Sequence, residues 1–89
     1  CPSEPRFHLA LAAAMQMQQE YALALSAYAA ALLLDANDPE PVYQMAVCLR
    51  ALDKGADARE ALQTAIEMSY LNPEYVSTAT KANRLLNEI

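Results

Sequence analysis

The chain has 89 residues, 55% of them hydrophobic, and a net charge of −5 from 11 acidic and 6 basic residues. A chain of this size forms at most one small domain, and without a basic cluster it lacks the charge with which proteins bind nucleic acid or anionic lipid. Its longest apolar run, Ala27–Leu34, is far shorter than the roughly 20 residues of a membrane-spanning helix.

Alanine and leucine are the most frequent residues, and there is a single glycine. Because alanine and leucine favour helices and glycine opposes them, we expect an all-α fold. The first residues show no charged segment followed by an apolar one, which is the pattern of a secretory signal. We therefore expect an intracellular protein.

The first predicted pair of helices covers residues 5–38. Its segment "AAAMQMQQEYALAL" contains neither glycine nor proline, and taken alone it is compatible with one long helix. Alignment with the second half of the chain, at an offset of about 34 residues, places a turn near Gln18–Glu20. We therefore predict two helices here.

The second predicted pair covers residues 39–72. Asp38 is a strong N-cap, and Pro39 is favoured at the first helical position. The helix is predicted to end near Leu52, and Gly55 is expected to permit a tight turn before a second helix, "ADAREALQTAIEMS". The apolar faces of these two helices comprise Val42, Met45, Ala46 and Leu49, then Ala58, Ala61, Leu62, Ala65 and Ile66.

A closing helix is predicted over residues 73–89. Asn72 and Pro73 repeat the cap and proline of the second pair at the same offset. The inner face of this helix is predicted to be formed by Val76, Ala79, Ala82, Leu86 and Ile89.

Paired helices with a period of about 34 residues resemble the tetratricopeptide repeat. Small residues recur at its alanine positions: Ala12, Ala24, Ala31, Ala46, Ala58 and Ala65. The large position of the second helix is occupied by Tyr28 and then by Leu62. We therefore expect an all-α tetratricopeptide-repeat domain over residues 1–89, with repeats at about 5–38 and 39–72 and a capping helix at about 73–89.

The sequence departs from this repeat in two ways. Ala36 and Tyr70 stand where the repeat usually ends in proline, and His8 and Val42 replace its usual tryptophan. The opening "CPSEPRF" occupies the place of the later linker "LDANDPEPV". We therefore expect a truncated piece of a longer array, or self-association that covers the exposed face of the first pair, because a stack normally needs about three repeats.

In such an array the second, fifth, ninth and twelfth residues of each first helix line a concave groove. These positions hold Arg6, Leu9, Ala13, Gln16, Glu40, Tyr43, Val47 and Arg50, and the closing helix adds Glu74, Ser77, Lys81 and Arg84. A mixed groove of this kind suits an extended peptide whose side chains fill small apolar pockets. The alternative that these are ordinary surface residues of a repeat using another face stays open.

Metal binding and catalysis are not expected. Cys1, Cys48 and His8 are isolated from one another, whereas zinc ligands usually come in close pairs. Cys48 is predicted to be a buried, inert thiol. The chain has no Ser–His or Cys–His pair at useful spacing and no glycine-rich phosphate loop, so we expect neither an enzyme nor a cofactor.

A closer resemblance lies in a series of short segments. Phe7 follows "PR", and "LALAAAMQ", "YALALSAY", the acidic "DANDPEP" and "YQMAVCL" with Cys48 come after it. Together they are similar to the tetratricopeptide chaperones of bacterial type III secretion, the class II group that includes SycD, LcrH, PcrH and IpgC. The resemblance covers nearly the whole chain but not the family's N-terminal helices and first repeat, and "DKGADA" replaces the usual "LGD" turn.

This resemblance implies a cytoplasmic chaperone of hydrophobic translocator proteins, which form a pore in the host membrane. The family binds an extended client segment of the P-x-L-x-x-P kind in the concave groove without ATP, and a homodimer is compatible with it. Carried onto this chain, the peptide-binding residues are Arg6, Phe7, Leu9, Ala13, Gln16, Tyr43, Val47 and Arg50. The alternative function is a generic scaffold module that assembles proteins through its convex or end faces.

Overall fold

The computed structural model describes residues 5–35 and 37–88, which form helices and no strand. The all-α fold expected from composition is confirmed. The helices are α1 (Pro5–Met17), α2 (Tyr21–Leu34), α3 (Glu40–Ala51), α4 (Gly55–Tyr70) and α5 (Val76–Glu88), with a short 3₁₀ turn, η1 (Pro73–Tyr75), directly before α5.

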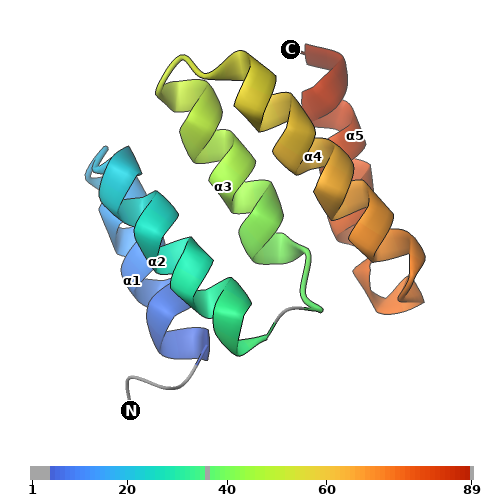
Figure 1. Cartoon of the computed structure of the whole chain (residues 1–89), viewed down its shortest axis with the longest axis horizontal. Coiled ribbons are helices and arrows are strands. Elements are labelled where there is room, and N and C mark those ends of the chain that lie inside the picture. The colour runs from blue at the N-terminus through green and yellow to red at the C-terminus, as the bar shows by residue number, and fades with distance from the viewer. Residues whose placement is uncertain (1–4, 36, 89) are drawn as a thin grey trace.

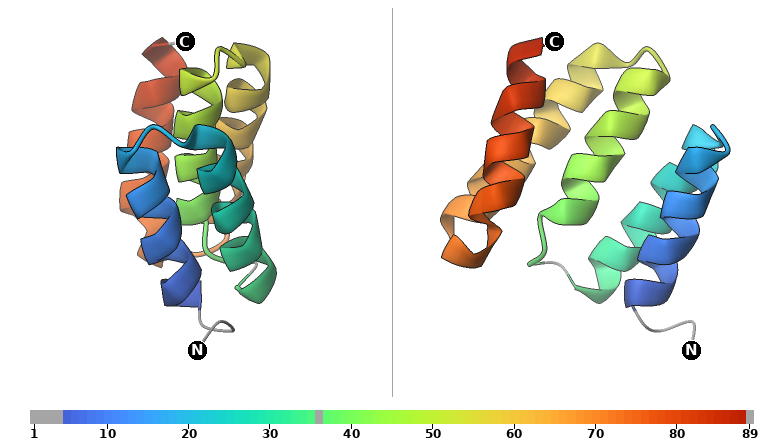
Figure 2. Two further views of the ribbon diagram at one scale, coloured as in Figure 1. Left: turned by 90° about the vertical axis from the view of Figure 1, so that its left-hand side faces the viewer. Right: turned by 180° about the vertical axis from the view of Figure 1, so that it is seen from behind.

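Each helix runs antiparallel to the one before it and packs mainly against its neighbours in sequence (Figure 1). The hairpins α1–α2 and α3–α4 stack through α2 and α3, and α5 covers α4. Seen along the stack, α1 and α5 lie on one side and α2 and α4 on the other (Figure 2). The result is the tetratricopeptide-like array of helical hairpins that the sequence period predicts.

The predicted break near Gln18–Glu20 is confirmed, and both hairpins turn in the same way. Gln19 and Asp53, which occupy equivalent positions of the two hairpins, each have φ of 64°. After α1 the Glu20 N–H donates to the carbonyl of Met15 at 2.8 Å, and after α3 the same step joins Lys54 to Leu49 at 2.9 Å. This six-to-one bond is the Schellman ending of a helix, so the repeat extends to the backbone of the turns.

The role predicted for Gly55 is wrong. It is the first residue of α4, and no glycine among the described residues has a positive φ. The left-handed position falls two residues earlier, at Asp53, because the Schellman geometry places it directly after the helix end and aspartate tolerates that conformation.

The predicted N-cap Asn72 is confirmed, whereas α3 begins at Glu40 with Pro39 as its N-cap residue, one position after the predicted Asp38. An Asp38 carboxylate oxygen accepts the N–H of Glu40 at 3.0 Å, and the Asn72 amide oxygen accepts the N–H of Glu74 at 3.1 Å. After Asn72 the chain makes the 3₁₀ turn before it enters α5. The two side chains thus precede helical segments of different geometry.

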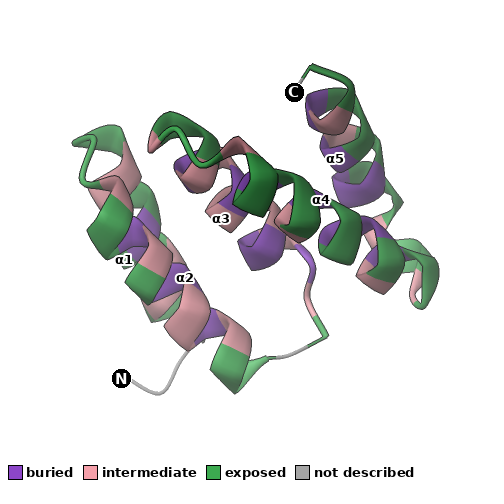
Figure 3. Cartoon of the chain, turned by 45° about the horizontal axis from the view of Figure 1, so that its top comes forward, coloured by how far each residue is buried: buried purple, intermediate pink, exposed green. Residues whose placement is uncertain are grey.

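Alanines make up much of the buried surface between the helices. All six predicted alanine positions are buried, and Tyr28 and Leu62 are buried beside them with exposed fractions of 3% and 0%. Figure 3 shows the buried faces turned toward neighbouring helices and the exposed faces turned outward. Of the other predicted apolar residues, Met45, Leu49 and Ala61 are half-buried against the same clusters.

The predicted inner face of the closing helix is partly wrong. Ala79 and Ala82 are buried, but Val76 is 66% exposed and Leu85 is more deeply buried than Leu86. With 3.6 residues per turn, Val76 lies about 120° around the axis from Ala82, and Thr78 takes the buried position instead. Ile89 and Cys1 lie outside the described residues.

Leu62 is a fully buried large side chain, so its truncation tests the packing of the second hairpin. We expect Leu62→Ala to lower the free energy of unfolding by about 2–5 kcal/mol, because it removes apolar contacts and leaves a cavity. Denaturant titration followed by circular dichroism measures this change. Leu33→Ala, at a position 86% exposed, should change stability by less than about 0.5 kcal/mol; equal losses for the two variants would contradict the packing.

Candidate functional site

An apolar pocket of about 380 Å³ opens between the first hairpin and α3. Helix α2 packs against both α1 and α3 and so holds those two helices apart. The pocket is lined from α1 by Ala13, Gln16 and Met17, from α2 by Tyr21 and Tyr28, and from α3 by Gln44, Val47 and Ala51. It is therefore a depression in the groove side of the array, with α2 as its floor.

Three of the eight predicted peptide-binding residues lie in this pocket: Ala13, Gln16 and Val47. They occupy the ninth and twelfth positions of the first pair and the ninth of the second. The lining residues that sequence reasoning missed are Met17, Tyr21, Tyr28, Gln44 and Ala51. Tyr28 had a signal, since it fills the large position of its repeat; Gln44 directly follows a groove position.

The other predicted residues lie outside the pocket. Leu9 and Tyr43 are half-buried and pack against the two apolar clusters. Arg6 and Phe7 are exposed on the first turn of α1, where the Phe7 ring meets His8 edge-on at 5.4 Å. Arg50 is exposed at the end of α3 and contacts Glu88 of α5 at 3.4 Å.

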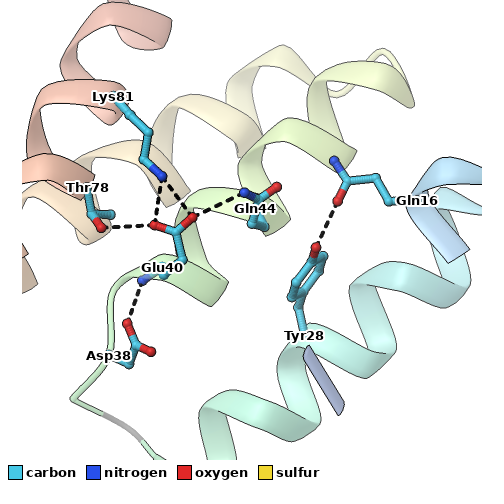
Figure 4. A network of polar contacts seen from close by, with 7 residues as sticks. All are labelled: Gln16, Tyr28, Asp38, Glu40, Gln44, Thr78 and Lys81. Atoms are coloured by element: carbon cyan, nitrogen blue, oxygen red, sulfur yellow. Dashed lines mark hydrogen bonds and ion pairs between the residues drawn. The ribbon is translucent and has the colours of Figure 1, made fainter. Parts of the chain in front are cut away.

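Glu40 is the centre of a polar network that joins α3 to α5 (Figure 4). Its carboxylate accepts hydrogen bonds from Lys81 Nζ at 3.0 and 3.1 Å and from Thr78 Oγ1 at 2.9 Å. Gln44 Nε2 donates to the same carboxylate at 3.2 Å. Burial alone would raise the pKa of Glu40, but the bonds from Lys81, Gln44 and Thr78 outweigh it, and the pKa is lowered.

The same lysine of α5 also contacts an aromatic ring of α3. Lys81 Nζ lies 5.0 Å from the centre of the Tyr43 ring, a cation–π distance. Lys81 is thus held by both Glu40 and Tyr43, with its ammonium group over one face of the Tyr43 ring. Tyr43 is not among the residues that line the pocket.

Tyr28 places a hydroxyl at the floor of the pocket. This hydroxyl donates a hydrogen bond to Gln16 Oε1 at 2.8 Å, joining α2 to α1 (Figure 4). Burial, followed by the nearby Cys48 and Glu40, raises the pKa of Tyr28, so the hydroxyl keeps its proton at neutral pH.

Cys48 is fully buried beside Tyr28 in the apolar cluster of the first hairpin and forms no disulfide. Burial raises the pKa of its thiol, which keeps it protonated and weakly nucleophilic. The predicted buried cysteine is confirmed. Within residues 5–35 and 37–88, no three histidine, cysteine or acidic side chains are grouped as a metal site would require, and no helix there is long and apolar enough to cross a bilayer.

Known proteins resemble this chain in sequence and in fold. No family model matches it. The low calcium response locus protein H of Yersinia pseudotuberculosis serotype I is 29% identical over 86 residues, which are 97% of this chain and 51% of that protein. The chain thus spans about half the length of this curated relative.

Several solved structures share the fold, and two of them show what such a chain can bind or form. The Yersinia enterocolitica translocator chaperone SycD, solved as an alternative dimer, matches with a TM-score of 0.90 and 28% identity over 97% of this chain and 65% of that one. The same chaperone in complex with a peptide of the translocator YopD matches with a TM-score of 0.88 and 28% identity over 97% of this chain and 66% of that one. The resemblance to the class II type III secretion chaperones is confirmed.

The lowered pKa of Glu40 means that the folded chain binds this proton less tightly than the unfolded chain does. The free energy by which ionised Glu40 stabilises the fold is fully present above its unfolded pKa of 4.5. It is lost as the pH falls through the lower pKa of Glu40 in the folded chain. We expect the melting temperature of Glu40→Gln to fall less than that of the parent between neutral pH and about pH 3.

Thermal unfolding at several pH values measures this difference. Glu60→Gln, at an exposed position on α4, is the matched control and should follow the parent. Parallel pH profiles for the parent and Glu40→Gln would show that the network adds nothing to stability.

Proposed function

We propose that this chain, a relative of the type III secretion translocator chaperones, is itself a chaperone that holds an extended segment of a hydrophobic translocator protein. The carrying observation is the apolar pocket at three predicted groove positions, Ala13, Gln16 and Val47. It lies in a fold shared with a chaperone that was crystallised with a translocator peptide.

The shape and chemistry of the pocket support this proposal. A volume of about 380 Å³ suits one or two side chains rather than a folded partner. Six of its eight lining side chains are alkyl, thioether or aromatic groups, and Gln16 and Gln44 supply the two amides. An apolar client side chain inserted here would leave water at little polar cost, while the client backbone would keep hydrogen-bond partners.

We propose the following contacts for the client. The segment would cross between α1 and α3, with its apolar side chain on Ala13 and Val47 and its main chain near Gln16. Neighbouring parts of the segment would reach the groove edge on either side. The full proposed set is Arg6, Phe7, Leu9, Ala13, Gln16, Tyr43, Val47 and Arg50.

Binding of this kind needs no covalent reaction. A translocator segment that would aggregate in water is covered by the groove, and the complex forms and dissociates by affinity alone. We accordingly propose a non-catalytic protein without a cofactor that acts in the bacterial cytoplasm, before its client is exported. Self-association into a homodimer belongs to the same proposal, and the SycD dimer supports it.

We also propose that the chain forms one tetratricopeptide domain, with repeats at about 5–38 and 39–72 and a capping helix at about 73–89. Two pairs of equivalent features support this division: the Schellman turns at Gln19 and Asp53, and the side-chain capping bonds of Asp38 and Asn72. Both pairs recur at the spacing of the sequence period.

Co-expression with a hydrophobic translocator tests the proposal against the scaffold alternative. A chaperone should keep the translocator soluble and copurify with it, and a peptide from the bound region should compete for the groove. A scaffold that assembles proteins through its convex or end faces would do neither. Failure of both readouts would refute the chaperone function.

A charge in the pocket should prevent client binding without unfolding the array. We expect Val47→Asp, and Ala13→Asp at an exposed lining position, to weaken binding of a YopD peptide by about tenfold or more, because the carboxylate would be desolvated without a partner. Fluorescence anisotropy measures the affinity, and circular dichroism checks helicity. The control is Gln63→Asp on the exposed side of α4, which should bind as the parent does; unchanged affinity in both pocket variants would move the site elsewhere.

A further inference from the structure

The Gln16 amide is held in one orientation. Its oxygen accepts the hydrogen bond from the hydroxyl of Tyr28, a side chain that is only 3% exposed and therefore has little freedom to move. With the oxygen engaged, the NH₂ group points away from Tyr28. In Figure 4 this nitrogen lies at the end of the amide opposite the bond to Tyr28.

The Gln44 amide is fixed by a different partner. Its nitrogen donates to Glu40 Oε1, and an ionised carboxylate can only accept hydrogen bonds. Lys81 keeps that carboxylate charged through contacts to both oxygens. The amide oxygen of Gln44 is therefore turned away from Glu40, and in Figure 4 it lies on the side toward Gln16.

The two remaining amide atoms reach solvent in the pocket. Gln16 Nε2 and Gln44 Oε1 have no hydrogen-bond partner within residues 5–35 and 37–88, and no buried side-chain nitrogen or oxygen there lacks one. Both residues line the same pocket, one from α1 and the other from α3. The pocket thus has an amide donor on the α1 side and an amide acceptor on the α3 side, each oriented by the bond at the other end of its amide.

We propose that Gln16 and Gln44 clamp the main chain of the bound segment: the Gln16 amide donates to a client carbonyl, and the Gln44 amide oxygen accepts a client N–H. The inference rests on the proposed function. In a trans peptide unit the C=O and N–H point in opposite directions, so an extended segment passing between the two walls presents one to each.

A clamp of this kind separates two tasks within one pocket. The glutamines bind groups that every residue except proline carries, whereas Ala13 and Val47 select an apolar side chain. Glu40 acts as a positioning residue, because it orients Gln44 without lining the pocket itself. The clamp would thus fix the path of the client while leaving most of its sequence free.

Affinity for synthetic peptides that cover YopD tests the clamp. Gln16→Met and Gln44→Met keep the side-chain length but lose the amide. We expect each to lower the affinity for the peptide that binds the parent by about fivefold, the effect of losing one hydrogen bond. Gln63→Met, at an exposed position on α4, should bind as the parent does.

An ester scan of the same peptide identifies the main-chain contact. Replacing one amide N–H at a time by an ester oxygen should weaken binding to the parent about fivefold at one position, and that loss should vanish in Gln44→Met. The position of the ester loss is found with the unaltered protein, and circular dichroism must show that Gln44→Met keeps the parent's helicity before the two losses are compared.

The outcomes separate the two proposals. If the parent binds a peptide and Val47→Asp prevents it, but neither methionine variant nor any ester has an effect, the clamp is refuted and the chaperone function stands. An ester loss that is equal in the parent and in Gln44→Met also refutes the clamp. If the parent binds no translocator peptide, both proposals fail.

Discussion

The close approach of helices at alanine residues is the constraint on which the rest of this structure depends. Ala12, Ala24, Ala46, Ala58 and Ala65 have no exposed surface, and each belongs to one of the two buried clusters between the helices. A side chain that ends at Cβ lets two backbones approach, and a larger one would force them apart. The helix spacing, and with it the width of the groove, follows from these positions.

Tyr28 is the large exception on the alanine-rich face of α2, and it accounts for the pocket. Its ring is buried in the cluster that joins Ala12 of α1 to Cys48 of α3, and its hydroxyl donates a hydrogen bond to Gln16. Helix α2 packs against α1 on one side and against α3 on the other, and the pocket lies between those two helices, with Tyr28 in its lining. The core of the hairpin and the proposed binding site share this one residue.

Local rules and the sequence period were enough to predict the helices, the cap at Asn72, and the buried alanines. The turn residue was mispredicted because the Schellman position after α3 holds Asp53, and aspartate tolerates the left-handed conformation that glycine more often supplies. The face of α5 was mispredicted because a 3₁₀ turn precedes it, so the helix does not follow the phase counted from Pro73.

The site was predictable only where it follows repeat positions, as at Ala13, Gln16 and Val47. The orientation of Gln44 depends on Glu40, and that of Glu40 depends on Lys81, which is 41 residues away on another helix. Sequence periodicity carries no information about such a contact. For the same reason the covering of Tyr43 by Lys81 could not be predicted.

The position of the pocket has a consequence for the mechanics of the array. Its lining comes from both hairpins, and the hairpins pack against each other mainly through α2 and α3. In stacked repeats this kind of boundary is where one unit separates from the next during partial opening. A peptide bound across this boundary would contact both hairpins and would have to be released before they separate. An occupied array would therefore open as one cooperative unit, whereas an empty one would open hairpin by hairpin.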